Sequence, residues 1–415
     1  MKNKNNSEKG QAIVYLAIGL VVFLGFVALA IDGGMALADR RHSQNGADSS
    51  SLSGGAEAAL TLESNHIDYK NWSCGTVASA IVNAENTSIT RAAANNFSID
   101  HDLSDHNGVV AECLSTYYDD LNFLDKYIDV TVDISATTQS NFAQLLFPNA
   151  LHNEVDATTR IRPRQPLAFG NAIVALNPEN CSGHQNGGIM YGDGEILVDG
   201  GGVFSNGCLH DNGHPTVVIT DGVALGNELW IIHPENWDPE PEPSDFQIPE
   251  SAYYVPIPNC HDHWVDDLPL MPILISGLYC INDDLKINAG DEISSTVAGV
   301  TIYVPNGKVD INGNATVKIS APPENPDPKP ALPGVLLYLP ASNTRDVEIN
   351  GTALSLFKGL ILAPRSSIVL NGTSGNSYVG QVIGWNVEVG GTNDFSLLYD
   401  GEEVFNTPTA IELAK

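Results

Sequence analysis

The chain has 415 residues, and its 19 Lys and Arg residues stand against 50 Asp and Glu residues, which gives a formal charge of −31 at pH 7. So few cations against so large an acid excess exclude the basic surface that nucleic-acid binding needs. The composition is 43% hydrophobic and 17% charged, as in a folded globular protein, and 38 Gly and 24 Pro residues predict a turn-rich, mainly β structure.

The first predicted element is an apolar helix from Ala12 to Ile31. At about 1.5 Å per residue it is long enough to cross the roughly 30 Å apolar core of a bilayer. Lys2, Lys4 and Lys9 precede it, and this cation excess predicts a cytoplasmic tail (1–11), one transmembrane helix (12–31) and an extracytoplasmic remainder in the cytoplasmic membrane or at the cell surface. The alternative is a cleaved signal peptide with its cleavage site at residues 28–30.

The helical pattern continues beyond Asp32 with small residues at spacings of three and four. These residues would let the helix approach another backbone closely, and they are Ala36, Ala38, Ala47, Ser51, Gly54, Ala58 and Ala59.

The same segment carries a motif made of Gly10, Gln11, Asp32, Gly33, Arg40, Arg41, Gln44, Ala47 and Asp48. This motif resembles the N-terminal domain of the Tad/Flp pilus-assembly family, of the TadE/TadG-like type. Pilin-like members that are cleaved carry Glu five residues after the glycine, where this chain has Tyr15. The resemblance therefore implies the uncleaved, membrane-anchored TadG-like type, with other pilus-assembly proteins or pilin as partners.

A small α+β module is predicted over residues 32–162. Residues 76–97 read as a helix, and the alternating runs 127–134 and 154–161 read as half-buried strands with a short helix at 141–147 between them. The prolines of the segment 163–168 predict a linker.

A right-handed parallel β-helix is predicted over residues 169–405, followed by a C-terminal tail over 406–415. Asn-Gly and Asp-Gly dipeptides recur between short β-branched runs, and a loose repeat follows the asparagines Asn288, Asn312, Asn350 and Asn371. We expect these asparagines to form a ladder at one corner of stacked coils, with Asn371 nearer the open end. The segment also resembles the β-helical ectodomains of some TadG-like proteins. A β-sandwich or jelly roll is the alternative.

All six cysteines follow the apolar helix, and an even number in an oxidising compartment predicts three disulfides. Six cysteines allow fifteen pairings. The domain boundaries favour Cys74 with Cys113, Cys181 with Cys208, and Cys260 with Cys280.

One cluster beside Cys260 is the best candidate for a metal site. It comprises His261, Asp262, His263, Asp266 and Asp267. We interpret it as a solvated loop within an acidic, Pro-rich insertion (234–272), and we predict neither a metal nor a cofactor. Many β-helices cleave polysaccharides, but the acids Asp283 and Asp284 and the lysines Lys286, Lys308 and Lys318 form no recognisable lyase or hydrolase arrangement.

The sequence thus predicts a structural protein that is anchored in the membrane by one N-terminal helix. It would act in the assembly, anchoring or surface adhesion of a Tad/Flp, type IV-like pilus, and it would not be an enzyme. The alternative is a secreted or surface β-helix protein that binds or degrades polysaccharide, with a surface glycan as its ligand.

Overall fold

A computed structural model describes residues 11–139, 151–182, 187–268, 273–324, 329–350, 354–372, 377–391 and 394–414. The chain divides into two compact units. The first comprises Met1–Ser115, Lys126–Pro163 and Thr409–Lys415, and the second comprises Thr116–Asp125 and Arg164–Pro408.

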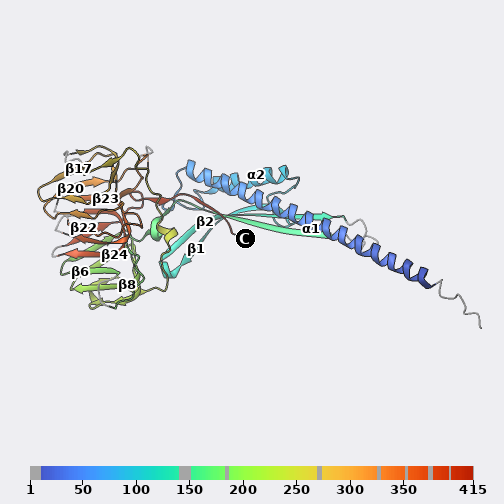
Figure 1. Ribbon diagram of the computed structural model, residues 1–415, viewed down its shortest axis with the longest axis horizontal. Coiled ribbons are helices and arrows are strands. Elements are labelled where there is room, and N and C mark those ends of the chain that lie inside the picture. Colours follow the sequence, from blue (N-terminus) through green and yellow to red (C-terminus); the bar gives the residue numbers. More distant parts are fainter. Residues whose placement is uncertain are drawn as a thin grey trace, which may run out of the picture. The chain divides into compact units, whose positions relative to one another are not determined.

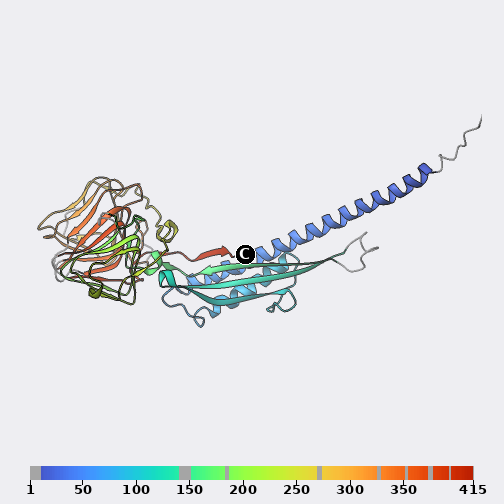
Figure 2. The ribbon, with the colours of Figure 1, turned by 90° about the horizontal axis from the view of Figure 1, so that it is seen from below.

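The first unit packs two helices against a four-stranded sheet. The helices are α1 (Gln11–Ser64) and α2 (Ala78–Ala94). The sheet has the order β1-β2-β3-β27, with bounds Asn107–Tyr118, Phe123–Thr138, Leu151–Arg162 and Ala410–Leu413. Figure 2 shows the sheet beside the C-terminal half of α1 and beside α2.

Alternation of side chains explains the two central strands of this sheet. Every second residue from Ile128 to Ile134 and from Val155 to Ile161 is buried against the helices, as strand geometry requires. The alternation of β2 is interrupted just before this run, where Tyr127 and Ile128 are both buried. β2 and β3 pair antiparallel from Ile128↔Ile161 to Thr138↔Leu151. The predicted helix at 141–147 lies outside the described residues.

The second unit is a stack of coils held together by three parallel ladders. The first ladder comprises β5 (Ile173–Ala175), β8 (Val203–Gly213), β10 (Ala224–Trp230), β12 (Glu242–Pro243), β13 (Trp264–Val265), β15 (Gly277–Ile281), β18 (Val300–Tyr303), β21 (Val335–Tyr338) and the middle parts of β23 (Leu356–Asn371) and β24 (Ser377–Gly391).

The second ladder carries the repeat that the sequence revealed. It comprises β6 (Gly188–Gly192), β16 (Leu285–Ile287), β19 (Val309–Ile311), β22 (Val347–Asn350) and the C-terminal parts of β8, β10, β23 and β24. The third comprises β7 (Glu195–Asp199), β9 (Thr216–Thr220), β11 (Trp237–Asp238), β14 (Ile273–Leu274), β17 (Glu292–Ser295), β20 (Thr316–Ser320), β25 (Phe395–Leu398) and the first residues of β23 and β24.

Stacked coils of parallel strands are the arrangement of a parallel β-helix, and the alternating apolar residues fill its interior. The hand of the coil stays a prediction.

The coils do not stack in chain order. β24 pairs on one side with β23 and on the other with β5 and β6, although about two hundred residues separate them along the chain. From that junction the chain runs outward through β8 and β10, and it later returns from β13 through β15, β18 and β21. Figure 1 shows the red β24 beside the green β6. The expectation that Asn371 lies near an open end is therefore wrong, because the first coils of the unit continue the stack beyond it.

A long segment, whose regular structure among the described residues is a single 3-10 turn, connects the two ends of the stack. It runs from β12 to β13 along the outer side of the first ladder, where Ser244 N donates to Gly226 O, Ile248 N donates to Asn206 Oδ1 (2.7 Å) and Tyr338 Oη donates to Val255 O (3.1 Å). Ile248 and Val255 are buried, and so are the outward-facing residues beneath them, among them Phe204 and Tyr338. This segment lies within the predicted insertion 234–272, and it covers one face of the stack.

Short elements complete the second unit. β4 (Gln165–Pro166) pairs antiparallel with β26 (Asn406–Thr407), so the segment that leads into the second unit lies beside the segment that leaves it. The 3-10 turns within its described residues are η2 (Asp119–Leu121), η4 (Leu167–Gly170), η5 (Pro234–Asn236) and η6 (Glu250–Tyr253). Residues 406–415, expected as a tail, thus contain β26 and also β27 of the first unit's sheet.

Candidate functional site

The apolar half of α1 is the first candidate. Its large residues are exposed, among them Leu20, Phe23 and Phe26, and no charged residue interrupts the helix between Ala12 and Ile31. α1 is long and apolar enough to cross a membrane, and it is the one such helix in the described part of the chain. Leaving so many apolar side chains exposed to water is unfavourable, so a lipid environment accounts for this half of the helix.

The second half of α1 uses its small residues for packing inside the first unit. A Cβ added at Gly54 would lie 2.8 Å from the Ala84 carbonyl oxygen of α2, and one added at Gly55 would lie 2.5 Å from Thr159 Cγ2 of β3. α2 meets this face with its own small residues, including Ala84 and Ser88. The small-residue stripe is therefore occupied by this chain's own helix and sheet.

The predicted motif residues lie along this helix. Gln44 Nε2 donates to Asp48 Oδ1 (2.8 Å) and to Asp156 O of β3 (3.2 Å), which links two motif residues to the sheet. Asp32 and Ala47 are buried, whereas Gly33, Arg40 and Arg41 are exposed. Gln11 begins α1, and Gly10 lies outside the described residues.

The six cysteines form three disulfides. Cys74 is bonded to Cys113, Cys181 to Cys208, and Cys260 to Cys280, with Cα–Cα distances of 5.6, 4.8 and 5.9 Å. These are the pairs that the domain boundaries favour. Their loops span 39, 27 and 20 residues, for which loop closure entropy gives about 3 to 4 kcal/mol of stabilisation each.

The four predicted ladder asparagines follow equivalent positions of the second ladder. The structure brings two side chains together: Asn371 Nδ2 donates to Asn350 Oδ1 (2.5 Å), and Tyr191 Oη donates to Asn371 Oδ1. Asn312 Oδ1 instead accepts from Asn314 N within its own turn, and Asn288 N donates to Asp291 Oδ2. Tyr191 is a member of this row that the repeat could not reveal, because its strand ends in Tyr191-Gly192 where the repeat has Asn-Gly.

The acidic cluster beside Cys260 lies at the β13 end of the stack. His261 Nδ1 lies 2.8 Å from Asp262 Oδ1, and both side chains are more than four-fifths exposed. Asp266 and Asp267 are also exposed. Among the described residues, no group of three or more His, Cys, Asp and Glu side chains is arranged to hold a metal ion.

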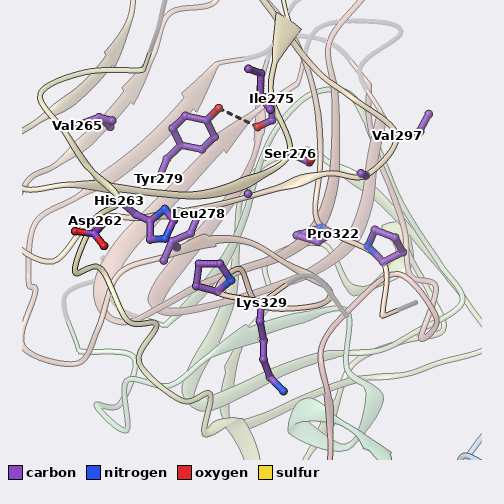
Figure 3. Close-up of a pocket in the computed structure, with 14 residues that line it drawn as sticks. Asp262, His263, Val265, Ile275, Ser276, Leu278, Tyr279, Val297, Pro322 and Lys329 are labelled. Atoms are coloured by element: carbon purple, nitrogen blue, oxygen red, sulfur yellow. Dashed lines mark hydrogen bonds between the residues drawn. The ribbon is translucent and has the colours of Figure 1, made fainter. Parts of the chain in front are cut away.

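Two members of the cluster line a groove that the sequence did not reveal. The groove measures about 790 Å³ and follows the corner between the third and first ladders, where β14, β17 and β20 turn into β15, β18 and β21. Its walls are mostly apolar and include Ile275, Leu278, Val297 and Pro322. Tyr279 Oη is held by a bond to Ile275 O (2.8 Å), as Figure 3 shows.

Polar groups occur at the edges of this groove. Asp262 and His263 lie on one side, and Lys329 lies on another with its amine directed away from Asp262 (Figure 3). Burial raises the pKa of the Tyr279 phenol, so it is neutral at physiological pH. The only sequence signal for the groove is the Pro-rich excursion between β20 and β21, whose prolines supply one wall.

Comparison with known proteins gave one family. Residues 10–57 match the Tad model, described as Flp pilus-assembly TadE/G-like. No curated protein and no solved structure gave a match. The matched segment contains the exposed apolar half of α1 and most of the half that packs against α2 and β3. Residues 10–57 of this chain are therefore a Tad domain of the TadE/G-like, Flp pilus-assembly type, which supports a pilus-related role.

Proposed function

We propose that this protein is a membrane-anchored, extracytoplasmic structural component of a Tad pilus system. It holds a disulfide-stabilised β-helix outside the membrane, and it acts in pilus assembly, anchoring or adhesion by contacts with other proteins and not by catalysis. Its N-terminus lies in the cytoplasm, and the coil of its β-helix is right-handed, as crossover connections between parallel strands almost always are.

One observation carries the proposal: the Tad domain is a single helix with two different surfaces. Its first half exposes apolar side chains on every face, and one face of its second half is buried by α2 and β3. Because α1 is one continuous helix, it connects the membrane directly to the folded part of the first unit. The disulfides all follow the apolar half, which agrees with an oxidising compartment for both units.

Membrane retention tests the anchor. Leu20→Arg places a charge in the apolar half, where insertion is disfavoured by about 3 kcal/mol, so the variant should shift from the membrane fraction to the soluble fraction. Leu60→Arg is the matched control, since Leu60 is also exposed on the same helix, at 65% against 55% for Leu20, but belongs to the packed half. Protease added outside intact cells should digest the second unit of the wild-type protein.

The pilus role needs its own measurement. A deletion strain should lose surface pili or pilus-dependent attachment, and the Leu60→Arg protein should restore them whereas Leu20→Arg should not. Normal piliation in the deletion strain, or turnover of a glycan by the purified protein that a single Asp substitution abolishes, would contradict the proposal.

A further inference from the structure

We propose that the groove at the β13 end of the stack binds an apolar segment of another protein that carries Lys or Arg next to its apolar side chains. The inference concerns the second unit alone and goes beyond the anchoring role, which depends on α1.

The walls of the groove select the apolar part of the partner. Val297 is 99% exposed and Ile275 is 72% exposed, and they occupy the same corner of neighbouring coils. Pro322 and Pro323 extend the apolar surface at the next coil, and Val265 and Leu278 add to its apolar lining. Apolar residues that together line one groove are typical of a binding site, whereas apolar residues that are exposed singly are ordinary features of a protein surface.

Polar groups that line the groove can orient a peptide. Tyr279 keeps its ring in place through its bond to Ile275 O, and Ser276 and His263 offer further hydrogen-bonding groups. A few polar groups among apolar walls is the usual composition of a specific site.

Charge selects the basic part of the partner. Asp262 lies at the edge of the groove with its carboxylate 84% exposed, and Asp266 and Asp267 follow four and five residues later. The lysine that lines the groove directs its amine away from Asp262 (Figure 3). The whole chain carries a formal charge of −31, so a second copy would be repelled and a cationic segment attracted.

Selection from a random linear peptide library tests this inference. The intact protein, held in lipid nanodiscs, is used as bait beside the double variant Ile275→Ser/Val297→Ser and the control Leu354→Ser. Leu354 is also exposed in the second unit but lies outside the groove, so its substitution removes exposed apolar surface from another part of the same unit. Wild type and Leu354→Ser should enrich the same peptides, rich in apolar residues with Lys or Arg.

Binding of an enriched peptide is then measured by fluorescence anisotropy at low and high salt. The double variant should bind at least about tenfold more weakly, as expected when the central apolar contacts of an interface are removed. Asp262→Lys should weaken binding and reduce its salt dependence. Equal affinity of wild type and double variant would overturn the inference. So would enrichment of acidic peptides, or self-association of the wild type that the double variant abolishes.

Discussion

Two buried tyrosines of the second unit differ in whether their hydroxyl groups have a partner. Tyr338 Oη donates to Val255 O at 3.1 Å. Tyr378 lies between Phe357 and Phe395, with ring centroids 5.2 and 5.1 Å away, and its hydroxyl is buried without a hydrogen-bond partner in the described structure.

Removing each hydroxyl should therefore have opposite effects on stability. Tyr338→Phe should lower the free energy of unfolding by about 1 kcal/mol, because the Val255 carbonyl loses its donor. Tyr378→Phe keeps the aromatic stack and removes an unsatisfied buried group, so it should leave stability unchanged or raise it by about 1 kcal/mol. Chemical denaturation of the two variants in the same detergent measures both effects. A loss at Tyr378 as large as that at Tyr338 would show that its hydroxyl has a partner.

The Tyr338 phenol also predicts a dependence on alkaline pH. Burial, with the neighbouring Tyr303 and Tyr254 adding to it, raises the pKa of Tyr338 to about 12. The folded state thus holds this proton in a range where the unfolded chain, with a pKa of about 10, releases it. The stability that Tyr338 contributes is complete below about pH 10 and is lost as pH rises toward about 12. The difference in unfolding free energy between wild type and Tyr338→Phe should shrink over this range. A difference that stays constant would contradict the assignment.

The asparagine row allows a ranking of three substitutions. Asn371 lies between Asn350 and Tyr191, so Asn371→Ala removes two side-chain bonds and should cost about 1 to 2 kcal/mol. Asn350→Ala removes its bond to Asn371 and the bond that Asn350 Nδ2 donates to Glu348 Oε1 (2.9 Å), and it should cost less because this second bond is exposed to water. Asn312→Ala is the control, since its side chain accepts only within an exposed turn, and it should stay within about 0.5 kcal/mol of wild type. Thermal unfolding of the three variants gives the order, and a larger loss at Asn350 than at Asn371 would contradict it.

At the scale of single elements, α1 and α2 approach closely because small residues face each other. Gly54→Ala would place a methyl group 2.8 Å from the backbone oxygen of Ala84, which must shift, so we expect a loss of about 1 to 3 kcal/mol. Gly33→Ala is the control on the same helix, because a Cβ added at Gly33 would have no neighbouring atom within 4 Å. The added methyl group should be neutral or stabilising by up to about 1 kcal/mol.

Hydrogen exchange gives a local measurement of this contact. Amides of α2 should exchange faster in Gly54→Ala and at the wild-type rate in Gly33→Ala. Unchanged exchange in both variants would mean that the two helices can separate without loss, and it would contradict the packing described for the small-residue face.

How far each element could be predicted depends on how local its signal is. β2 and β3 alternate buried and exposed residues over most of their length, so the sequence reveals them. β1 could not be predicted in this way, because most of its residues from Glu112 to Tyr118 are exposed on both faces. β27 has four exposed residues and is recognisable only through its pairing with β3, which lies about 250 residues earlier.

The candidate sites also differ in how local their signals are in the sequence. The apolar helix and the Tad motif are contiguous in the sequence and could be recognised there, and the family match confirms the resemblance. The groove draws its residues from five separate segments between Asp262 and Pro330, which become neighbours only when the coils stack. Its most exposed apolar residues, Ile275 and Val297, look like ordinary strand and turn residues in the sequence.

At the scale of the whole molecule, the order of the coils is the feature that the sequence could not supply. The repeat predicts that β16, β19, β22 and β23 share a ladder, and the pairings place them so. It does not predict that β24 meets β5 and β6, because every coil presents a similar row of apolar residues and open backbone groups to the next. The segment from β12 to β13 makes this order possible by connecting the two ends of the stack.

This order predicts an unusual response to truncation. In a stack built in chain order, deleting the C-terminal coils would affect only their immediate neighbours, because each coil contacts the next one alone. Here β5, β6 and β7 rest on β24 and β25, so deleting residues 356–415 should expose the first coils of the unit. We expect amides of residues 173–199 to exchange at least about tenfold faster, and limited proteolysis to cut among them.

Deletion of residues 406–415 alone is the control, because it removes β26 and β27 and leaves β24 and β25 in place. Exchange within residues 173–199 should then stay close to that of the full chain, although the sheet of the first unit loses its last strand. If the longer deletion left residues 173–199 protected while residues 335–350 lost protection, the coils would have to stack in chain order. The pairing of β24 with β5 would then be wrong, since a coil that depends on its neighbours for burial cannot keep its protection when one of its two neighbours is removed.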